Sequence, residues 1–204
     1  MNAREALGRL QSLRMSAVTT ADAAAVLGLS IEAASHSLRR LALSDLITSV
    51  RKGLWALSRK PDPFVLAEHV TAPYPSYLSL QTALYQRGMI MQIPTMIYVV
   101  SLGRGGRIET KIGTYSVHHV QPEIFGGFES IAGSGIKLAL PEKALVDFLY
   151  LSPTRGRLFT TVPELEMPPV FQRKIAREWV RRIPSRRLRN LVELRLEHLL
   201  DRTD

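Results

Sequence analysis

The sequence of 204 residues contains no cysteine. This absence excludes disulfide bonds, catalysis by a thiol and zinc sites with cysteine ligands. Long apolar runs are missing as well, since no apolar stretch reaches the ~18 residues that a membrane-spanning helix needs. The N-terminal stretch MNAREALGRLQSL is amphipathic and too polar for a signal peptide. We therefore expect a cytoplasmic protein that has no membrane partner.

Recognisable catalytic and cofactor motifs are also lacking. His118 and His119 are adjacent on a predicted strand, so their side chains point to opposite faces, which is poor geometry for one metal ion. The glycine-rich stretch 103–106 matches neither the phosphate-binding loop nor the dinucleotide fingerprint, and is typical of a hairpin turn. No serine lies in a G-x-S-x-G motif. The sequence therefore predicts a protein that is not an enzyme and that has no cofactor and no metal site.

The composition is that of a globular protein, with 46% hydrophobic and 22% charged residues, and the length favours two small domains. The net charge of +9 is concentrated at the two ends of the chain. Residues 1–60 hold nine Lys/Arg against four Asp/Glu, and residues 171–204 hold ten against five, a net of +5 in each case. Residues 61–170 have a net charge of −1, from eight against nine. Clustered cations favour phosphate, because each neutralised phosphate releases condensed counterions.

Residues 19–43 carry the pattern of a helix-turn-helix. Thr19 and Thr20 are residues that cap the start of a helix, and the alanine-rich stretch 21–27 is a strong helix former. Gly28 suits the left-handed conformation that ends a helix, and Ser30 can cap a second one. That second helix has apolar residues at helical spacing, namely Ala34, Leu38 and Leu41. A second helix in this arrangement lies in the DNA major groove and reads base edges from its N-terminal end.

A basic hairpin is predicted directly after this pair of helices. The β-prone runs 47–50 and 54–57 enclose the short turn Arg51-Lys52-Gly53. Together with a first helix at 4–13, the segment resembles the winged helix family, in which the tip of the wing usually contacts phosphate. The alternative is an ordinary helical hairpin that is packed for stability and whose charges are merely solvated.

The winged helix interpretation predicts a recognition helix at 30–43, a wing at 47–57 and a specific set of DNA contacts. The predicted DNA-binding residues are Thr20, Ser30, Ile31, Glu32, Ala33, Ser35, His36, Arg39, Arg40, Arg51 and Lys52.

Proline marks the boundary between the two predicted domains. We place a winged helix-turn-helix domain at 1–59, a proline-rich linker at 60–75 and a second domain at 76–204. The second domain has a helical pattern ending at Gly88, strands near 96–100 and 136–140, a hairpin with arms at 108–112 and 115–120, a turn at 126–129, and a helix that starts at Pro141. The predicted fold class is α+β, with a mixed α/β C-terminal domain that ends in basic helices.

Three segments of the second domain resemble the AbiEi antitoxin family of type IV toxin–antitoxin systems. They are Tyr77-Leu78-Ser79 with Ala83-Leu84 and Gly88, then Ile93-Pro94 before Tyr98-Val99, then Leu138-Ala139-Leu140 followed by PEKALVDFLY at 141–150. The resemblance implies an N-terminal winged helix and an AbiEi-like C-terminal domain. It also implies a transcriptional autorepressor that binds its own promoter and counteracts a nucleotidyltransferase-like toxin. The short reach of one recognition helix further predicts that two copies associate on an inverted-repeat operator.

The C-terminal region is predicted to form two basic helices, over 171–182 and 186–200. The candidate second basic surface consists of Arg173, Lys174, Arg177, Arg181 and Arg182. These cations suit a nucleic acid or an acidic partner, and the alternative is a solvated face on two packed helices.

Two other functions of the whole chain stay open. The chain can be a module that binds a protein or nucleic-acid partner, or a ligand-responsive regulator with no toxin partner.

Overall fold

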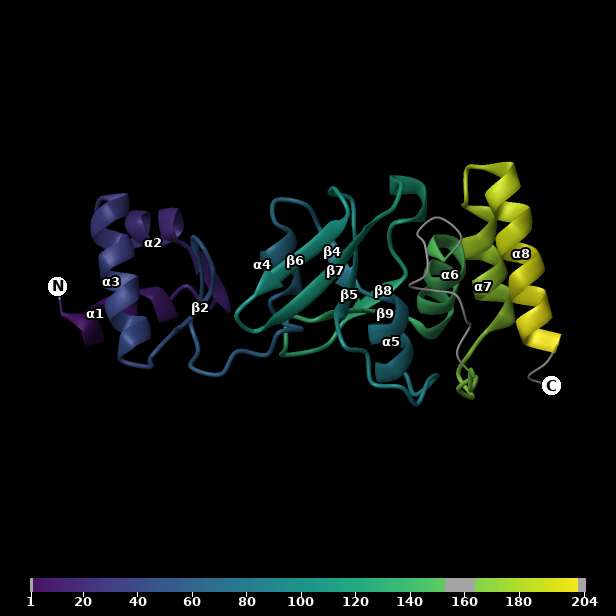
Figure 1. The fold of residues 1–204 in the computed structure, drawn as a ribbon, viewed down its shortest axis with the longest axis horizontal. Coiled ribbons are helices and arrows are strands. Elements are labelled where there is room, and N and C mark those ends of the chain that lie inside the picture. Colours follow the sequence, from purple (N-terminus) through teal and green to yellow (C-terminus); the bar gives the residue numbers. More distant parts are fainter. Residues whose placement is uncertain (1, 153–163, 202–204) are drawn as a thin grey trace. The chain divides into compact units, whose positions relative to one another are not determined.

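A computed structural model describes residues 2–152 and 164–201 of the chain (Figure 1). The fold is a mixed α+β architecture in which N-terminal helices with a small antiparallel sheet are followed by a six-stranded mixed sheet and C-terminal helices. The chain divides into two compact units, Met1–Val70 with Ile108–Thr114 and Thr71–Arg107 with Tyr115–Asp204. Among the described residues, no helix combines the length and the apolar character that crossing a bilayer requires.

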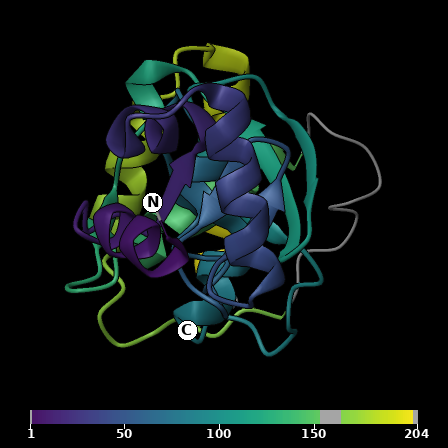
Figure 2. The same ribbon diagram turned by 90° about the vertical axis from the view of Figure 1, so that its left-hand side faces the viewer.

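The N-terminal helices and a small sheet form the main body of the first unit, in the purple and blue part of the ribbon that faces the viewer in Figure 2. Its elements are α1 Ala3–Gln11, β1 Ala17–Thr19, α2 Thr20–Leu27, α3 Ile31–Leu43, β2 Thr48–Arg51 and β3 Leu54–Ala56. The sheet is antiparallel throughout, and its strand order is β1-β3-β2. The predicted helix pair and hairpin are present, whereas strand β1 was missed because three residues give too short a run for a period-2 pattern.

Local sequence signals explain where α2 and α3 begin and end. Thr19 forms a reciprocal capping box with Asp22 at the start of α2, so Thr20 is the first residue of the helix rather than its cap. Gly28 ends α2 in the left-handed conformation, with φ of 65°. The Ser30 side chain then caps α3 by accepting a hydrogen bond of 3.2 Å from the Ala33 backbone N–H.

The core of the first unit joins all three helices to the sheet. Leu10 of α1, Leu27 of α2 and Leu38 of α3 are buried together with Ile47 and Trp55. A fully buried side chain of this kind contributes about 1.5–3 kcal/mol relative to its exposed state. Because the apolar face of α3 is committed to this core, its polar face points to solvent.

The second unit is built on the mixed sheet. Its elements are α4 Ala67–Thr71, β4 Ser76–Leu78, α5 Leu80–Gln86, β5 Ile97–Ser101, β6 Gly106–Thr110, β7 Gly113–His119, the 3-10 helix η1 Pro122–Ile124, β8 Phe128–Ser130, β9 Lys137–Ala139, α6 Pro141–Leu151, α7 Arg173–Arg181 and α8 Arg186–Asp201. Of these, α4, β6 and β7 each include residues of the first unit. The strand order is β6-β7-β5-β4-β9-β8. The pairs β5–β7 and β4–β9 are parallel, and the pairs β4–β5 and β8–β9 are antiparallel. Helix α6 packs against α5, α7 and α8.

Ser76 and Ser79 were both candidates for the cap of the helix that ends at Gly88. The structure has Ser79 at the N-cap and starts the helix at Leu80, while residues 76–78 form the strand β4 between β5 and β9. One prediction for this unit was wrong. Residues 126–129 were assigned to a turn, but Phe128–Ser130 forms the strand β8 beside β9. For β4, pairing with strands that lie far away in the sequence overrides a short and ambiguous local pattern, whereas β8 forms a local hairpin with β9 and its three residues are too short for a period-2 pattern.

Candidate nucleic-acid interface

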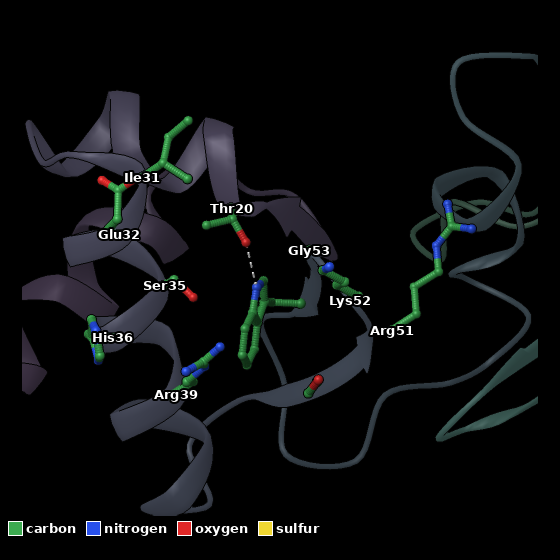
Figure 3. A pocket seen from close by; sticks show the side chains of 11 residues that line it. Thr20, Ile31, Glu32, Ser35, His36, Arg39, Arg51, Lys52 and Gly53 are labelled. Carbon is green, nitrogen blue, oxygen red and sulfur yellow. Dashed lines mark hydrogen bonds between the residues drawn. The ribbon is translucent and has the colours of Figure 1, made fainter.

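A groove of about 560 Å³ separates the exposed face of α3 from the β2–β3 hairpin (Figure 3). It is lined by Thr20, Ile31, Glu32, Ser35, His36, Arg39, Ser49, Arg51, Lys52, Gly53 and Trp55. Helix α3 and the hairpin thus contribute most of the lining, and Thr20 contributes from the start of α2.

The spacing of residues on α3 explains why these side chains share one face. Positions 32, 35/36 and 39 are three or four residues apart, so their side chains lie above one another along the helix. Ala34, Leu38 and Leu41 occupy the opposite side and are completely buried. The burial of that stripe fixes the rotation of α3 about its axis, so Ser35, His36 and Arg39 face the groove.

Three cations line the groove. Arg39 and Lys52 are exposed, and Arg51 at the end of β2 is half-buried. No carboxylate in the described part of the chain forms an ion pair with any of the three. Their charges are therefore available to an anionic ligand, and a nucleic-acid backbone is such a ligand.

Trp55 lines the groove and fixes β3 against the start of α2. Its indole N–H donates a hydrogen bond of 3.0 Å to the Thr20 hydroxyl, which joins β3 to the first turn of α2 (Figure 3). The ring is only 7% exposed and belongs to the core of the unit. Thr20, predicted as a DNA contact, therefore also has a structural role. Trp55 and Ser49 were missed as lining residues, because within a short β-prone run the sequence does not tell which face looks at α3.

Eight of the predicted DNA-binding residues line the groove: Thr20, Ile31, Glu32, Ser35, His36, Arg39, Arg51 and Lys52. Ser30, Ala33 and Arg40 are not among its lining residues. Ser30 and Ala33 form the cap of α3 described above. Arg40 is exposed on the adjacent face of the helix. The structure thus separates two neighbouring arginines that the sequence treats alike.

The groove continues past Arg39 toward the C-terminal end of α3. A second depression of about 650 Å³ shares Arg39, Ser49 and Trp55 with the first and extends to Leu43 and Thr48. Arg39 therefore lies at the middle of a continuous concave surface along the helix.

Among the residues that the structure describes, Glu32 is the one carboxylate that lines the groove. Hydrogen bonds from its own backbone N–H and from the Ser30 side chain hold its pKa below the usual value. The side chain is fully exposed, so its charge is screened by water, but it is ionised at neutral pH.

The candidate second basic surface in the C-terminal helices is partly engaged in internal contacts. Arg177 forms a bidentate ion pair with Glu197, at 2.8 and 2.7 Å, and this pair lowers the pKa of Glu197. Arg173 donates to the Leu200 carbonyl oxygen at 3.4 Å, and the Arg182 guanidinium lies 4.3 Å from the centre of the Trp179 ring. Lys174 and Arg181 are exposed. Arg173 and Arg177 therefore hold α7 against α8, which matches the alternative of packed helices for part of this set.

A buried polar cluster lies in the core of the second unit. The Tyr77 hydroxyl and the Ser79 hydroxyl donate to the same oxygen of Asp147, at 2.9 and 2.8 Å. The other oxygen of Asp147 accepts from the Lys143 ammonium group, and both of these residues are 1% exposed. The Lys143 ammonium also lies 5.1 Å from the centre of the Trp179 ring, which connects α6 to α7. This cluster was not predicted, although the i,i+4 spacing of Lys143 and Asp147 on a helix was a signal for it.

No protein-family model matches this chain, and no curated protein shows significant sequence similarity to it. The resemblance to the AbiEi family therefore rests on the residues quoted above. Within residues 2–152 and 164–201, no group of three or more histidine, cysteine or acidic side chains is placed to hold a metal ion.

Proposed function

We propose that the chain is a sequence-specific regulator of transcription that binds double-stranded DNA through its first unit. In this proposal the first unit is a winged helix-turn-helix domain. Helix α3 enters the major groove, and the β2–β3 hairpin is the wing that contacts the phosphate backbone. The regulator represses its own promoter.

The groove between α3 and the hairpin supports this function. Ser35, His36 and Arg39 are side chains that can bond to base edges, and they stand in a row on the face of α3 that is not needed for the core. Arg51 and Lys52 lie across the groove, where a duplex seated on α3 would bring a phosphate strand.

The observation that carries the proposal is that the three groove cations have no ion-pair partner in the described residues, although Arg9, Arg59 and Arg177 each have one. An exposed ion pair contributes little stability, so the lack of one costs the fold almost nothing and leaves the three groove cations available to an anionic ligand. Contacts from such cations supply the salt-dependent part of DNA affinity.

The test is a mobility-shift titration of the full chain on the DNA upstream of its own gene. The comparison duplex has the same base composition in shuffled order, and unlabelled random DNA is present as competitor. We expect a shift on the promoter at a concentration at least tenfold lower than on the shuffled duplex, as specific sites generally exceed non-specific ones by 10³ or more. Equal binding to both duplexes would contradict recognition of a specific sequence, and no binding to either would leave the groove as an ordinary solvated surface.

The resemblance of the second unit extends the proposal to antitoxin action in a type IV toxin–antitoxin system. Tyr77 and Ser79 of one quoted segment and Lys143 and Asp147 of another meet in the buried cluster, so two of the three segments that carry the resemblance share one core. This supports a common domain type, and the antitoxin action itself is the expectation that the resemblance brings.

Co-expression tests this extension separately from DNA binding. A nucleotidyltransferase-like protein encoded in the neighbouring reading frame should arrest growth when produced alone, and the chain should restore growth. The Arg39→Ala variant should restore growth as well as the wild type, because we place neutralisation in the second unit. Unchanged arrest in the presence of the wild-type chain contradicts the antitoxin function and leaves the DNA-binding proposal untouched.

A further inference from the structure

The N-terminal end of α3 differs chemically from the rest of the groove. Ile31 and Glu32 line it there, next to a row that otherwise presents hydroxyl, imidazole and cationic groups (Figure 3). Ile31 is 58% exposed, which is high for a large aliphatic side chain. Glu32 places a negative charge in a groove whose other charged lining residues are Arg39, Arg51 and Lys52.

Neither of these two side chains suits a phosphate group. A carboxylate is repelled by the phosphate backbone, and an aliphatic side chain offers it no hydrogen-bond donor. Base edges offer what both need, since pyrimidines present a C5–H or a C5 methyl group and two of the four bases present an amino group in the major groove. This end of α3 is thus suited to contact with bases, which is also the end that reads bases in helix-turn-helix proteins.

An ionised carboxylate accepts hydrogen bonds and donates none. The hydrogen bonds from its own backbone N–H and from Ser30 hold the pKa of Glu32 low, so it stays ionised beside a base. Only the N4 amino group of cytosine and the N6 amino group of adenine can donate to it from the major groove. Adenine carries the N7 acceptor directly beside its amino group, and two acceptors repel each other. Cytosine carries the C5–H there, so cytosine is the favoured partner.

We propose that Glu32 is a specificity-determining residue that accepts a hydrogen bond from the N4 amino group of a cytosine in each operator half-site. This inference rests on the proposed DNA-binding function and names one base of its target. The Ile31 side chain lies against the C5 edges of pyrimidines at the same end of the helix and excludes water from the contact.

The test is an in vitro selection from a randomised duplex library, carried out with the full-length wild type and with Glu32→Gln. Glutamine keeps the shape of the side chain but adds an N–H donor, which suits the N7 and N6 groups of adenine. We expect the wild type to enrich cytosine at one position of each half-site, and Glu32→Gln to lose that preference roughly tenfold and to shift it toward adenine. Affinity for random DNA should stay equal or rise, because the variant removes a negative charge from the interface.

Glu5→Gln is the matched control, because Glu5 is also an acidic residue in the first turn of a helix but lies on α1 and does not line the groove. It should select the same sequences as the wild type. Identical selected sequences from the wild type and from Glu32→Gln, with the thermal midpoint of the variant unchanged, would overturn the inference while the DNA-binding function stands. A wild type that enriches no sequence would overturn both.

Discussion

At the scale of single residues, the adjacent arginines Arg39 and Arg40 differ in their position relative to the groove. Arg39 lies at the middle of the concave surface along α3, whereas Arg40 is exposed but does not line it. A bidentate contact between arginine and guanine contributes about 1–3 kcal/mol of discrimination. We therefore expect Arg39→Ala to weaken operator binding by at least an order of magnitude.

Arg40→Ala is the natural comparison, because it removes the same charge one residue away. It should weaken binding to the operator and to random DNA to the same small extent, through lost long-range attraction only. Fluorescence anisotropy titrations on both duplexes measure the two variants. Equal losses of specific affinity in the two variants would remove Arg39 from its central role.

A second prediction concerns Tyr77 and the stability of the fold, not DNA binding. Burial and the negative charge of Asp147 raise its pKa well above the usual 10.0. Because the folded pKa is raised, the stabilisation by Tyr77 is complete below pH 10.0 and is lost as the pH rises through the folded value. Tyr77→Phe should cost about 1–3 kcal/mol at pH 8, since a donor to a buried carboxylate is removed.

The difference between wild type and Tyr77→Phe should narrow above pH 10, because only the wild type has this hydroxyl to ionise. Urea unfolding at several pH values from 8 to 11 measures it. Burial lowers the pKa of Lys143, which gives the opposite slope in alkaline solution in both proteins, so the quantity to follow is the difference between the two proteins and not the slope of either one. A difference in the free energy of unfolding that stays constant to pH 11 would contradict the raised pKa of Tyr77.

The roles of single residues could be predicted from the sequence where they depend on the backbone of adjacent residues. The cap at Ser30 and the left-handed Gly28 were readable because capping and glycine conformations depend on only a few consecutive residues. The role of Trp55 was not readable, because its partner Thr20 lies 35 residues away in the sequence. The Asp147 cluster escaped for the same reason, since its hydroxyl donors precede it by 68 and 70 residues.

At the scale of elements, the β2–β3 hairpin should act through charge alone. Replacing both Arg51 and Lys52 with alanine should lower affinity equally for the operator and for random DNA. The plot of log affinity against log salt should become shallower by ~0.9 for each lost phosphate contact. Titrations at four salt concentrations measure the slope.

The double variant Arg4→Ala/Arg9→Ala removes two cations from α1, which does not line the groove, and should leave the salt slope unchanged. If the hairpin variant lost discrimination between sequences and kept its slope, the hairpin would read bases instead of phosphates.

The contact between α7 and the β8 region depends on a glycine. Gly127 has a φ of 69°, and a Cβ atom there would lie 2.7 Å from the Trp179 ring and 2.8 Å from the Lys143 side chain. Gly127→Ala should therefore combine the backbone cost of a left-handed residue with an overlap that costs a further ~1–3 kcal/mol. Chemical denaturation measures the free energy of unfolding.

Gly133→Ala isolates the backbone part of this cost. Gly133 has a φ of 73°, and a Cβ atom there meets nothing within 4 Å. The excess destabilisation of Gly127→Ala over Gly133→Ala is the packing cost of displacing Trp179. Equal effects of the two substitutions would mean that α7 is not fixed against this turn.

Element-level prediction succeeded for helices with an apolar stripe and failed for short central strands. Helix α3 is 13 residues long, and its buried residues Ala34, Leu38 and Leu41 are spaced three or four apart. This spacing is typical of a helix and does not fit a strand. Strand β4 has only the three residues Ser76–Leu78, and all of them are buried, so no alternation marks it as a strand. Its conformation comes from pairing with β5 and β9, which a local pattern does not contain.

At the scale of the whole molecule, the net charge of +9 does not translate directly into one binding surface. In the first unit, the three groove cations have no ion-pair partner among the described residues. At the C-terminal end, Arg177 is neutralised by Glu197, and Arg173 and Arg182 make contacts within the helix pair. The sequence counts both ends as +5, but part of the C-terminal charge is engaged within the helix pair, whereas Arg39, Arg51 and Lys52 all line one groove.

The reach of α3 sets the number of copies that bind one site. Its groove-lining residues run from Ile31 to Arg39, a rise of roughly 12 Å, which matches only about 3–4 base pairs. So short a sequence recurs by chance roughly every 60–260 base pairs, so one helix cannot select a single promoter. We therefore expect two copies of the chain to bind an inverted repeat whose half-site centres lie about one helical turn apart.

Sedimentation of the complex should give two chains per duplex. Inserting half a turn, about 5 base pairs, between the half-sites should reduce affinity because the copies would then face opposite sides of the DNA. An isolated half-site that binds as tightly as the full repeat would show that one copy suffices.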